Sequence, residues 1–436
     1  MTGADPRLRD DGLGWVTRAV FPDERLRLTL SPADAGDRPA DAAGPVASAR
    51  SAGDRPLARY AVVPSVAGAR FLLPLGSRRV TAASVWAYNA LRPPRVRLPR
   101  AVLGLAARTG ALAATRPVVL TVSAPADAGP VDELMLVDHL AARLGGQRWY
   151  AAIGVRPPDP NHKPTVQLFD QDGRPRGYAK LGWNGATRSL VRAEAAALSQ
   201  VAEVSGVGGH PVVPKLLTAG DWSGQAVTVV EPLPARIRAV GSGGPPQVAA
   251  VLALARRGGG PVPPQPLAGS AFLDRLRGIA AATQADATVD APAGRRALAA
   301  VNRLADRYGS VRVEFGHWHG DWVPWNLGRH AGTLVTWDWE HSGPDVPVGF
   351  DLAHEAFQCS LVLRGEPAEV AAAAVDTALG GLAAELCIDS DQRRMIVQSY
   401  LIEMWLRTWR LAAGGAGWNR ALHPALLDVI ERRSVD

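Results

Sequence analysis

The segment His319-Gly-Asp-Trp-Val-Pro-Trp-Asn326 is the most informative stretch of the 436-residue chain, and an aspartate follows it at position 338. Between Asn326 and Asp338, two short β-prone runs surround a glycine-containing turn, a pattern typical of a β-hairpin. A hairpin would return Asn326 to a point roughly opposite Asp338, so that two hard oxygen ligands converge. Pro324 stiffens the backbone between Asp321 and Asn326.

These groups have the spacing that phosphoryl transfer from a nucleotide requires. In kinases an aspartate orients the attacking hydroxyl, and a later Asn and Asp hold Mg²⁺ against the phosphates. The alternative interpretation is a polar loop beside a surface hairpin. The position of Pro324 and the distance to Asp338 favour the reaction site over that alternative.

The composition indicates a globular protein with two or three domains and a sizeable core. Hydrophobic residues make up 47% of the chain and charged residues 20%. The N-terminus has no apolar stretch typical of a signal sequence, and no window is long and apolar enough to span a membrane. With Cys359 and Cys387 as the two cysteines, we expect no disulfide framework and a location in the cytoplasm.

The basic residues are scattered, although the formal net charge is +7. A nucleic-acid-binding protein would be expected to gather them in a stripe, so we predict no nucleic-acid partner. Lysine is rare, with Lys163, Lys180 and Lys215 among 48 basic residues. The bias towards arginine raises the question of why each lysine was kept.

The sequence divides into an N-terminal accessory region and two lobes. We predict an α/β accessory region over residues 1–145, in which the Pro/Gly-rich stretch 33–56 is a mobile loop. A small lobe over 146–234 has three strands, a helix and two strands, and a larger, mostly helical lobe over 235–436 contains the catalytic segment 315–345. The predicted strands are 60–64, 70–74, 118–122, 148–155, 165–170, 177–183, 212–219 and 226–231, and the helices are 81–91, 131–144, 186–204, two within 270–308, 349–363, 366–385, 390–413 and 420–433.

Lys180 and Glu194 form the second candidate constellation. Lys180 lies inside a predicted strand, where a lysine is usually a solvated edge residue. Glu194 falls within the apolar stripe of the following helix, and an inward carboxylate is costly unless it meets a cation. We therefore predict that the two side chains pair and that the compact ammonium of Lys180 contacts nucleotide phosphates, a geometry that arginine would not reproduce.

Other parts of a nucleotide site are less well marked. The loop 156–164 contains no glycine, so a glycine-rich phosphate loop is absent, and His162 or Lys163 would either approach the phosphates or lie in a surface turn. Glu231 and Leu233, at the end of the last small-lobe strand, are predicted to meet the adenine edge.

Asp351, Trp322 and Trp325 each have a structural and a functional interpretation. Asp351 is predicted first as a helix N-cap and second as a brace that accepts amides of the catalytic loop. Trp322 and Trp325 are packing residues, or else an apolar wall for a flat-faced substrate. His319 is expected to be a structural hydrogen-bonding residue.

The residues resemble those of the aminoglycoside phosphotransferase family, in the protein-kinase-like superfamily with choline and homoserine kinases. The resemblance rests on His319–Asp321 with Pro324 and Asn326, on Val335–Glu340 and on Phe350–Ala353. It covers roughly 147–436 and implies an α+β, bilobal protein-kinase-like fold. It also implies Asp321 as catalytic base, Asn326 and Asp338 as magnesium ligands, and Lys180, oriented by Glu194, as phosphate anchor.

The resemblance predicts a Mg²⁺-dependent kinase that transfers the γ-phosphate of ATP or GTP to a hydroxyl of a sugar, an aminoglycoside-like compound or another small metabolite. Only twelve residues separate Asp338 from Asp351, which leaves no room for an activation loop and favours a small-molecule acceptor over a protein. The alternative is a non-catalytic pseudokinase or nucleotide-gated module whose first region contacts a partner protein.

Overall fold

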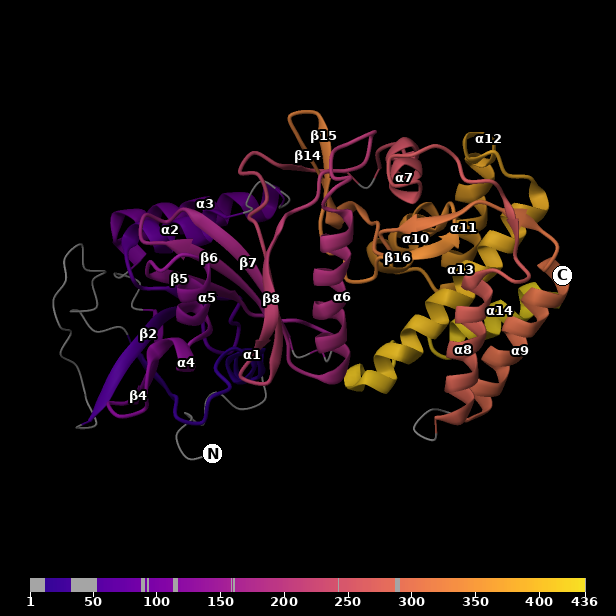
Figure 1. Cartoon of the computed structure of the whole chain (residues 1–436). Helices are drawn as coiled ribbons and strands as arrows, with labels where there is room; N and C mark the ends of the chain where they lie inside the picture. Colours follow the sequence, from indigo (N-terminus) through magenta and orange to yellow (C-terminus); the bar gives the residue numbers. More distant parts are fainter. Residues whose placement is uncertain are drawn as a thin grey trace. The chain divides into compact units, whose positions relative to one another are not determined.

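The computed structural model describes residues 12–32, 53–87, 91, 94–112, 117–157, 159, 161–241, 243–286 and 291–435. The chain forms two compact units, which are described separately (Figure 1). Unit 1 comprises Met1–Trp183 and Pro214–Ile237, and unit 2 comprises Asn184–Val213 and Arg238–Asp436. Helices and antiparallel strands are both present, so the predicted α+β class is confirmed.

Unit 1 is built on a nine-stranded sheet in the order β1-β4-β2-β3-β5-β6-β7-β9-β8. Neighbouring strands of this sheet all run antiparallel to each other. The strands are β1 Arg27–Pro32, β2 Asp54–Val63, β3 Phe71–Pro74, β4 Val118–Pro125, β5 Trp149–Gly154, β6 Thr165–Asp170, β7 Pro175–Gly182, β8 Leu216–Trp222 and β9 Gln225–Val230.

The two faces of this sheet are covered by different helices because strand residues alternate in direction. Tyr60 and Leu72 belong to the larger core with α1 and α5, whereas Ala61 and Leu73 pack with Val85 of α2. The helices are α1 Gly12–Val20, α2 Arg78–Trp86, α3 Pro94–Thr109, α4 Val131–Leu134 and α5 Leu136–Leu144.

One sheet runs through the predicted accessory region and the predicted small lobe. The boundary placed after residue 145 lies within unit 1, and β3 pairs with β5 across it through Phe71 and Gly154. Of the predicted loop 33–56, residues 33–52 lie outside the described residues. The predicted loop extends too far at its C-terminal end, because residues 54–56 belong to β2, and Asp54 pairs with Pro125 of β4.

Unit 2 is mostly helical. Its first helix, α6 (Gly185–Val201), begins with a capping box in which the Asn184 side chain accepts the Thr187 amide and the Thr187 hydroxyl accepts the Asn184 amide. The longest helix, α13 (Ser390–Leu411), is buried from Met395 to Trp409. The others are α7 Val248–Ala255, α8 Ala271–Ala285, α9 Ala291–Tyr308, α10 Phe350–Gln358, α11 Ala368–Gly381, α12 Ala383–Leu386 and α14 Ala425–Val435.

Short strands carry the catalytic segment of unit 2. The predicted hairpin is confirmed as β14 (Leu327–His330) and β15 (Thr333–Thr336), with Leu327 opposite Thr336. The backbone of Val212 bonds to Leu334 and Thr336 and holds the outer side of β15. The remaining strands are β10 Arg238–Ala239, which pairs with β14, β13 Phe315–Trp318 with β16 Gly343–Pro347, and β11 Gln265–Pro266 with β12 Arg312–Val313.

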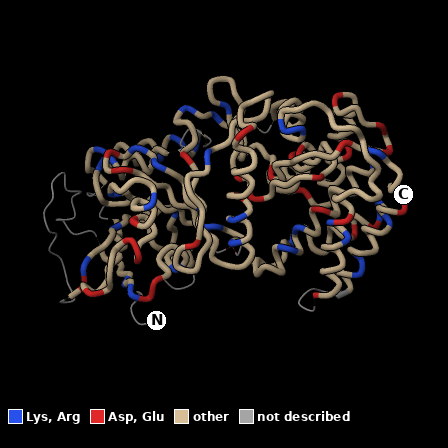
Figure 2. Tube along the Cα trace, viewed as in Figure 1, with Lys and Arg blue, Asp and Glu red and all other residues tan. Residues whose placement is uncertain are grey.

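Charges are interspersed along the described trace of both units. Figure 2 shows Lys and Arg alternating with Asp and Glu along each unit. Among the described helices, none combines the length and apolar character needed to cross a membrane.

Candidate active site

The carboxylate of Asp321 is held from two sides in unit 2. A short 3₁₀ turn, Pro324–Asn326, folds the Asn326 side chain back onto Asp321. Nδ2 of Asn326 donates to Oδ2 of Asp321 at 2.7 Å and to its backbone carbonyl at 3.1 Å. On the other side, Nε2 of His354 lies 3.1 Å from Oδ1. Both carboxylate oxygens therefore have a defined orientation before any substrate binds.

The loop before Asp321 is braced by buried charged groups. Asp351 accepts the backbone N–H of His319 at 2.8 Å and of Gly320 at 3.0 Å. Arg407 donates to the Gly320 carbonyl at 2.7 Å. The N-cap of α10 is Gly349, so the interpretation of Asp351 as an N-cap was wrong, and its side chain forms the brace instead.

Two features show how tightly this loop is packed. Gly320 has φ +77°, and a Cβ there would lie 2.1 Å from the His341 carbonyl oxygen, so only glycine fits without displacement of backbone. Burial raises the pKa of Asp351 to about 7, although the amides of His319 and Gly320 oppose the rise.

His354 extends the Asp321 network into the core. It lies on α10, three residues after Asp351, and both side chains are buried. Its Nδ1 is 3.0 Å from the Tyr400 hydroxyl, so a neutral ring with its proton on Nε2 can donate to Asp321 and accept from Tyr400. Burial lowers the pKa of His354, although Asp321 opposes the shift, which favours this neutral form. His354 was not among the residues predicted from the sequence. Its spacing of three residues from Asp351, which places both on one face of a helix, was the signal that could have identified it.

We expect His354→Ala to lower kcat by roughly 10- to 100-fold, because the Asp321 carboxylate loses the donor that fixes Oδ1 and misplacement of a reacting group is costly. His354→Gln, which can still donate, should recover part of the loss. Steady-state kinetics and nucleotide titrations of the two variants test this. An unchanged kcat, or a nucleotide Kd that weakens in parallel, would contradict a positioning role.

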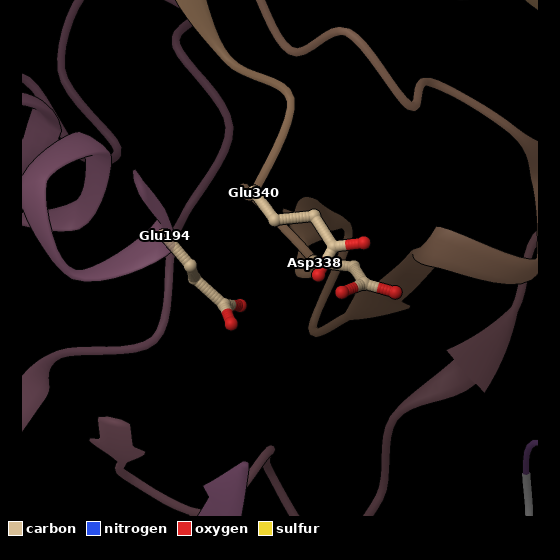
Figure 3. A group of neighbouring side chains, drawn as sticks. All are labelled: Glu194, Asp338 and Glu340. Carbon is tan, nitrogen blue, oxygen red and sulfur yellow. The ribbon is translucent and has the colours of Figure 1, made fainter. Parts of the chain in front are cut away.

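Three carboxylates gather beside the hairpin in unit 2 (Figure 3). The ligand oxygens of Glu194, Asp338 and Glu340 lie within 4.8 Å of one another, and Figure 3 shows the three carboxylates near the turn after β15. Glu194 is 2% exposed and Glu340 8% exposed. Ionised carboxylates at this separation repel one another, so the group could hold a cation.

The donors of this acidic group suit Mg²⁺, which prefers a few carboxylate oxygens and completes its shell with water and phosphate. Asp338 adopts φ +73°, and the turn after β15 carries both it and Glu340. Glu340 was not among the metal ligands predicted from the sequence. The Trp337 amide donates to the Asn326 carbonyl at 3.2 Å, so Asn326 lies opposite Trp337 rather than Asp338. Asn326 as a magnesium ligand stays a prediction.

The proposed nucleotide contacts are divided between the units. Lys180 lies on β7 of unit 1, which is paired with β6 and β9, so the alternative of a lysine on an edge strand was wrong. Glu194 lies in the buried stripe of α6 in unit 2, as predicted from the helical pattern. Their pairing, which would join the two units, stays a prediction. Glu231 and Leu233 follow β9 in unit 1, and their contact with adenine stays a prediction.

The aromatic residues of the segment mainly pack. Trp322 is fully buried, so it cannot form an open wall for a substrate, whereas Trp325 is 40% exposed. His319 is also buried, and its Nδ1 accepts the Asp321 amide at 3.2 Å. Burial lowers the pKa of His319 to about 4, although Asp321 and Asp338 oppose the shift. The ring is therefore a neutral acceptor within electrostatic range of both aspartates.

Glu355, the residue after His354, makes the stability of this region depend on pH. Burial raises the pKa of Glu355 to about 7. The folded protein therefore holds this proton more tightly than the unfolded chain, and stability is lost as the pH rises from about 4.5 to about 7. We expect Glu355→Gln to raise the free energy of unfolding at pH 8 by about 2 kcal/mol and to change it little at pH 4. Urea unfolding at both pH values measures the difference. Equal effects at the two pH values would contradict the assignment.

A cavity of about 600 Å³ opens in unit 2 beside the loop that carries Asp321. Trp318, next to the loop, and Glu340, of the acidic group, both line it. Three arginines from α8 and α13 and the first residues of α6 complete much of its wall. A molecule in this cavity would therefore lie next to the loop that carries Asp321 and next to Glu340 of the acidic group.

Comparisons with known proteins found similar solved structures but no matching family. No family model matches the chain, and no curated protein matches it. It is similar to a thermostable mutant of the aminoglycoside phosphotransferase APH(4)-Ia in ternary complex with ADP and hygromycin B, at 13% identity, covering 69% of this chain and 99% of that chain, with a TM-score of 0.45.

Two further solved structures are similar to the chain. For a macrolide 2'-phosphotransferase type I the identity is 16%, the coverage 67% of this chain and 95% of that chain, and the TM-score 0.41. For the choline kinase LicA from Streptococcus pneumoniae the identity is 12%, the coverage 69% of this chain and 96% of that chain, and the TM-score 0.38.

Proposed function

We propose that the chain is a Mg²⁺-dependent phosphotransferase that moves the γ-phosphoryl group of ATP or GTP to a hydroxyl of a small molecule. The observation that carries this proposal is the fixed Asp321 carboxylate. It is bonded by Asn326 and His354 on a loop that Asp351 and Arg407 brace. A carboxylate with this support is suited to orient an acceptor hydroxyl and take its proton.

In the proposed reaction, the acceptor oxygen forms a bond to the γ-phosphorus, and the bond from that phosphorus to the β–γ bridging oxygen breaks. The hydroxyl proton passes to Asp321, and the nucleoside diphosphate leaves with the bond electrons. Asp338 and Glu340 would hold Mg²⁺, with Asn326 as a further oxygen donor. The ion, when bound, offsets phosphate charge. Lys180 and the segment around Glu231–Leu233 of unit 1 would contact the nucleotide.

The test combines binding with a search for product. The protein is titrated with AMP-PNP, and with GMP-PNP, in the presence and absence of Mg²⁺. It is then incubated with ATP or GTP and a panel of sugars, sugar acids, aminoglycosides, macrolides and amino alcohols. We expect metal-dependent nucleotide binding and a product whose mass increases by one phosphoryl group. A failure to bind either nucleotide with Mg²⁺ would refute the proposal.

The non-catalytic alternative has one observation in its favour. On α3 of unit 1, Leu98, Val102 and Leu105 are 59–71% exposed, at helical spacing on one face. Such a face is typical of a protein contact. Nucleotide binding without phosphate transfer to any compound of the panel, together with capture of a partner by this face, would favour that reading.

A further inference from the structure

The cavity of unit 2 has a wall that is rich in guanidinium groups. Arg275 of α8 and Arg407 and Arg410 of α13 all line it. Arg407 lies with its guanidinium carbon 4.8 Å from the centre of the Trp318 ring, and it also bonds to the Gly320 carbonyl. This wall therefore continues directly into the loop that carries Asp321.

The three arginines share one buried carboxylate. Glu403 is 1% exposed and receives Arg275 at 2.8 Å and Arg410 at 2.9 Å. Burial alone would raise the pKa of Glu403, but Arg275, Arg410 and Arg407 hold it below its usual range, so it is ionised. The cluster thus carries three positive charges against one negative charge. Arg275 and Arg410 are 34% and 43% exposed, so both remain accessible from the cavity.

Glu340, Asp345 and the His341 ring also line the cavity. Glu340 belongs to the acidic group with Glu194 and Asp338, where a bound Mg²⁺ would offset part of the negative charge. Asp345 is exposed to solvent, where its charge is screened. The first turn of α6, at Gly185 and Ala186, adds the positive end of a helix dipole to the opposite wall.

We propose that the cavity is the acceptor site and that the acceptor carries an anionic group, a carboxylate or a phosphate, beside the hydroxyl that is phosphorylated. This inference rests on the proposed function and names its substrate class. Arg275 and Arg410 bind the anionic group, because guanidinium groups match the geometry of carboxylate and phosphate oxygens. The anion itself does not react. It places the hydroxyl towards Asp321, the group that takes the proton.

The same wall argues against a polycationic acceptor. An aminoglycoside carries several ammonium groups, which Arg275, Arg407 and Arg410 would repel at short range. The sequence analysis expects a sugar, an aminoglycoside-like compound or another small metabolite as acceptor. Of these, a sugar fits this cavity when it carries an acidic substituent, and an aminoglycoside-like compound does not.

The first experiment measures binding of inorganic sulfate, an anion without a sugar ring, by isothermal titration. Protein loaded with Mg²⁺ and AMP-PNP is used so that the nucleotide phosphate site is occupied. We expect one sulfate to bind, roughly 10-fold more weakly in Arg275→Gln and Arg410→Gln and with intermediate affinity in Arg410→Lys, which keeps the charge but loses the planar guanidinium geometry. Arg394→Gln is the matched control, since Arg394 is an exposed residue of α13 that pairs with Asp391. Equal sulfate binding by all variants, or none at about 10 mM, would overturn the proposal.

The second experiment compares acceptors that differ mainly in charge. Glucose, glucosamine, glucuronate and glucose 6-phosphate are assayed with ATP and Mg²⁺, and binding of each to AMP-PNP-loaded protein is measured in parallel. We expect an anionic member to bind and react at least about 10-fold better than glucose, with glucosamine weakest. A preference for glucuronate would indicate recognition of a carboxylate, and a preference for glucose 6-phosphate would indicate recognition of a phosphate. The preference should fall in Arg410→Gln and return only in part in Arg410→Lys, because lysine restores the charge but not the guanidinium geometry.

The outcomes separate the two proposals. Equal or tighter binding of glucosamine, with transfer to it, would overturn the anionic acceptor and leave the phosphotransferase function in place. Binding of glucuronate or glucose 6-phosphate at the arginine cluster, without AMP-PNP binding, would support an anion site and refute the phosphotransferase function. In every variant, the AMP-PNP affinity and the melting temperature show that the protein is folded.

Discussion

Asp321→Asn is expected to lower kcat by about 10³- to 10⁴-fold while nucleotide affinity stays within about twofold of wild type. The substitution keeps the size of the side chain but removes the basic oxygen that receives the acceptor proton. An amide offers one acceptor oxygen, whereas Asp321 uses one oxygen towards Asn326 and the other towards His354. Turnover with any accepted hydroxyl compound, and titration with AMP-PNP, measure the two quantities.

A matched variant separates loss of the base from a general effect of charge. Asp306 is an exposed aspartate of α9 in the same unit, and Asp306→Asn removes the same charge away from the site. We expect this control to behave like wild type in both measurements. If Asp321→Asn retained most of the turnover, Asp321 would not be the catalytic base.

The second large effect concerns the acidic group. We expect Asp338→Asn to weaken Mn²⁺ binding, measured by electron paramagnetic resonance in the presence of AMP-PNP, by roughly 100-fold. Glu340→Gln should weaken it by roughly 10-fold, because Asp338 and Glu194 still supply charge near the same centre. Both variants should need more Mg²⁺ for half-maximal turnover.

The control for this pair is Asp345→Asn. Asp345 is an exposed residue of β16 and lies outside the acidic group. Its substitution should leave the Mn²⁺ affinity unchanged. Wild-type Mn²⁺ affinity in Asp338→Asn would contradict the metal site, and a larger effect of Glu340→Gln than of Asp338→Asn would assign the main ligand to Glu340.

The parts of the structure that depend on short-range pattern could be predicted from the sequence. The β14–β15 hairpin follows from two β-prone runs around a turn, and its register was predicted to within one residue. The inward position of Glu194 follows from helical periodicity, because the stripe of α6 was readable over several turns. The α+β class follows from the same local patterns.

The parts that depend on long-range packing could not be predicted. His354 and Arg407 meet the catalytic loop from α10 and α13, 33 and 87 residues away from their partners. For His354 the one signal in the sequence was its helical spacing from Asp351, and for Arg407 no local spacing specifies the contact. The nine-stranded sheet likewise depends on the β3–β5 pairing, which the sequence pattern on either side of residue 145 does not reveal. For Trp322, the sequence left open both packing and an apolar wall for a substrate, and the structure shows that it packs in the core.

The most direct test of the central claim follows the γ-phosphate itself. ATP labelled at this group is incubated with Mg²⁺, the protein and the best acceptor of the panel, and the label is measured in acceptor and in inorganic phosphate. The proposed function predicts that wild-type protein moves the label to the acceptor and that Asp321→Asn, with nucleotide still bound, does not. Label that stays in ATP, or that reaches the acceptor equally fast with Asp321→Asn, would contradict it.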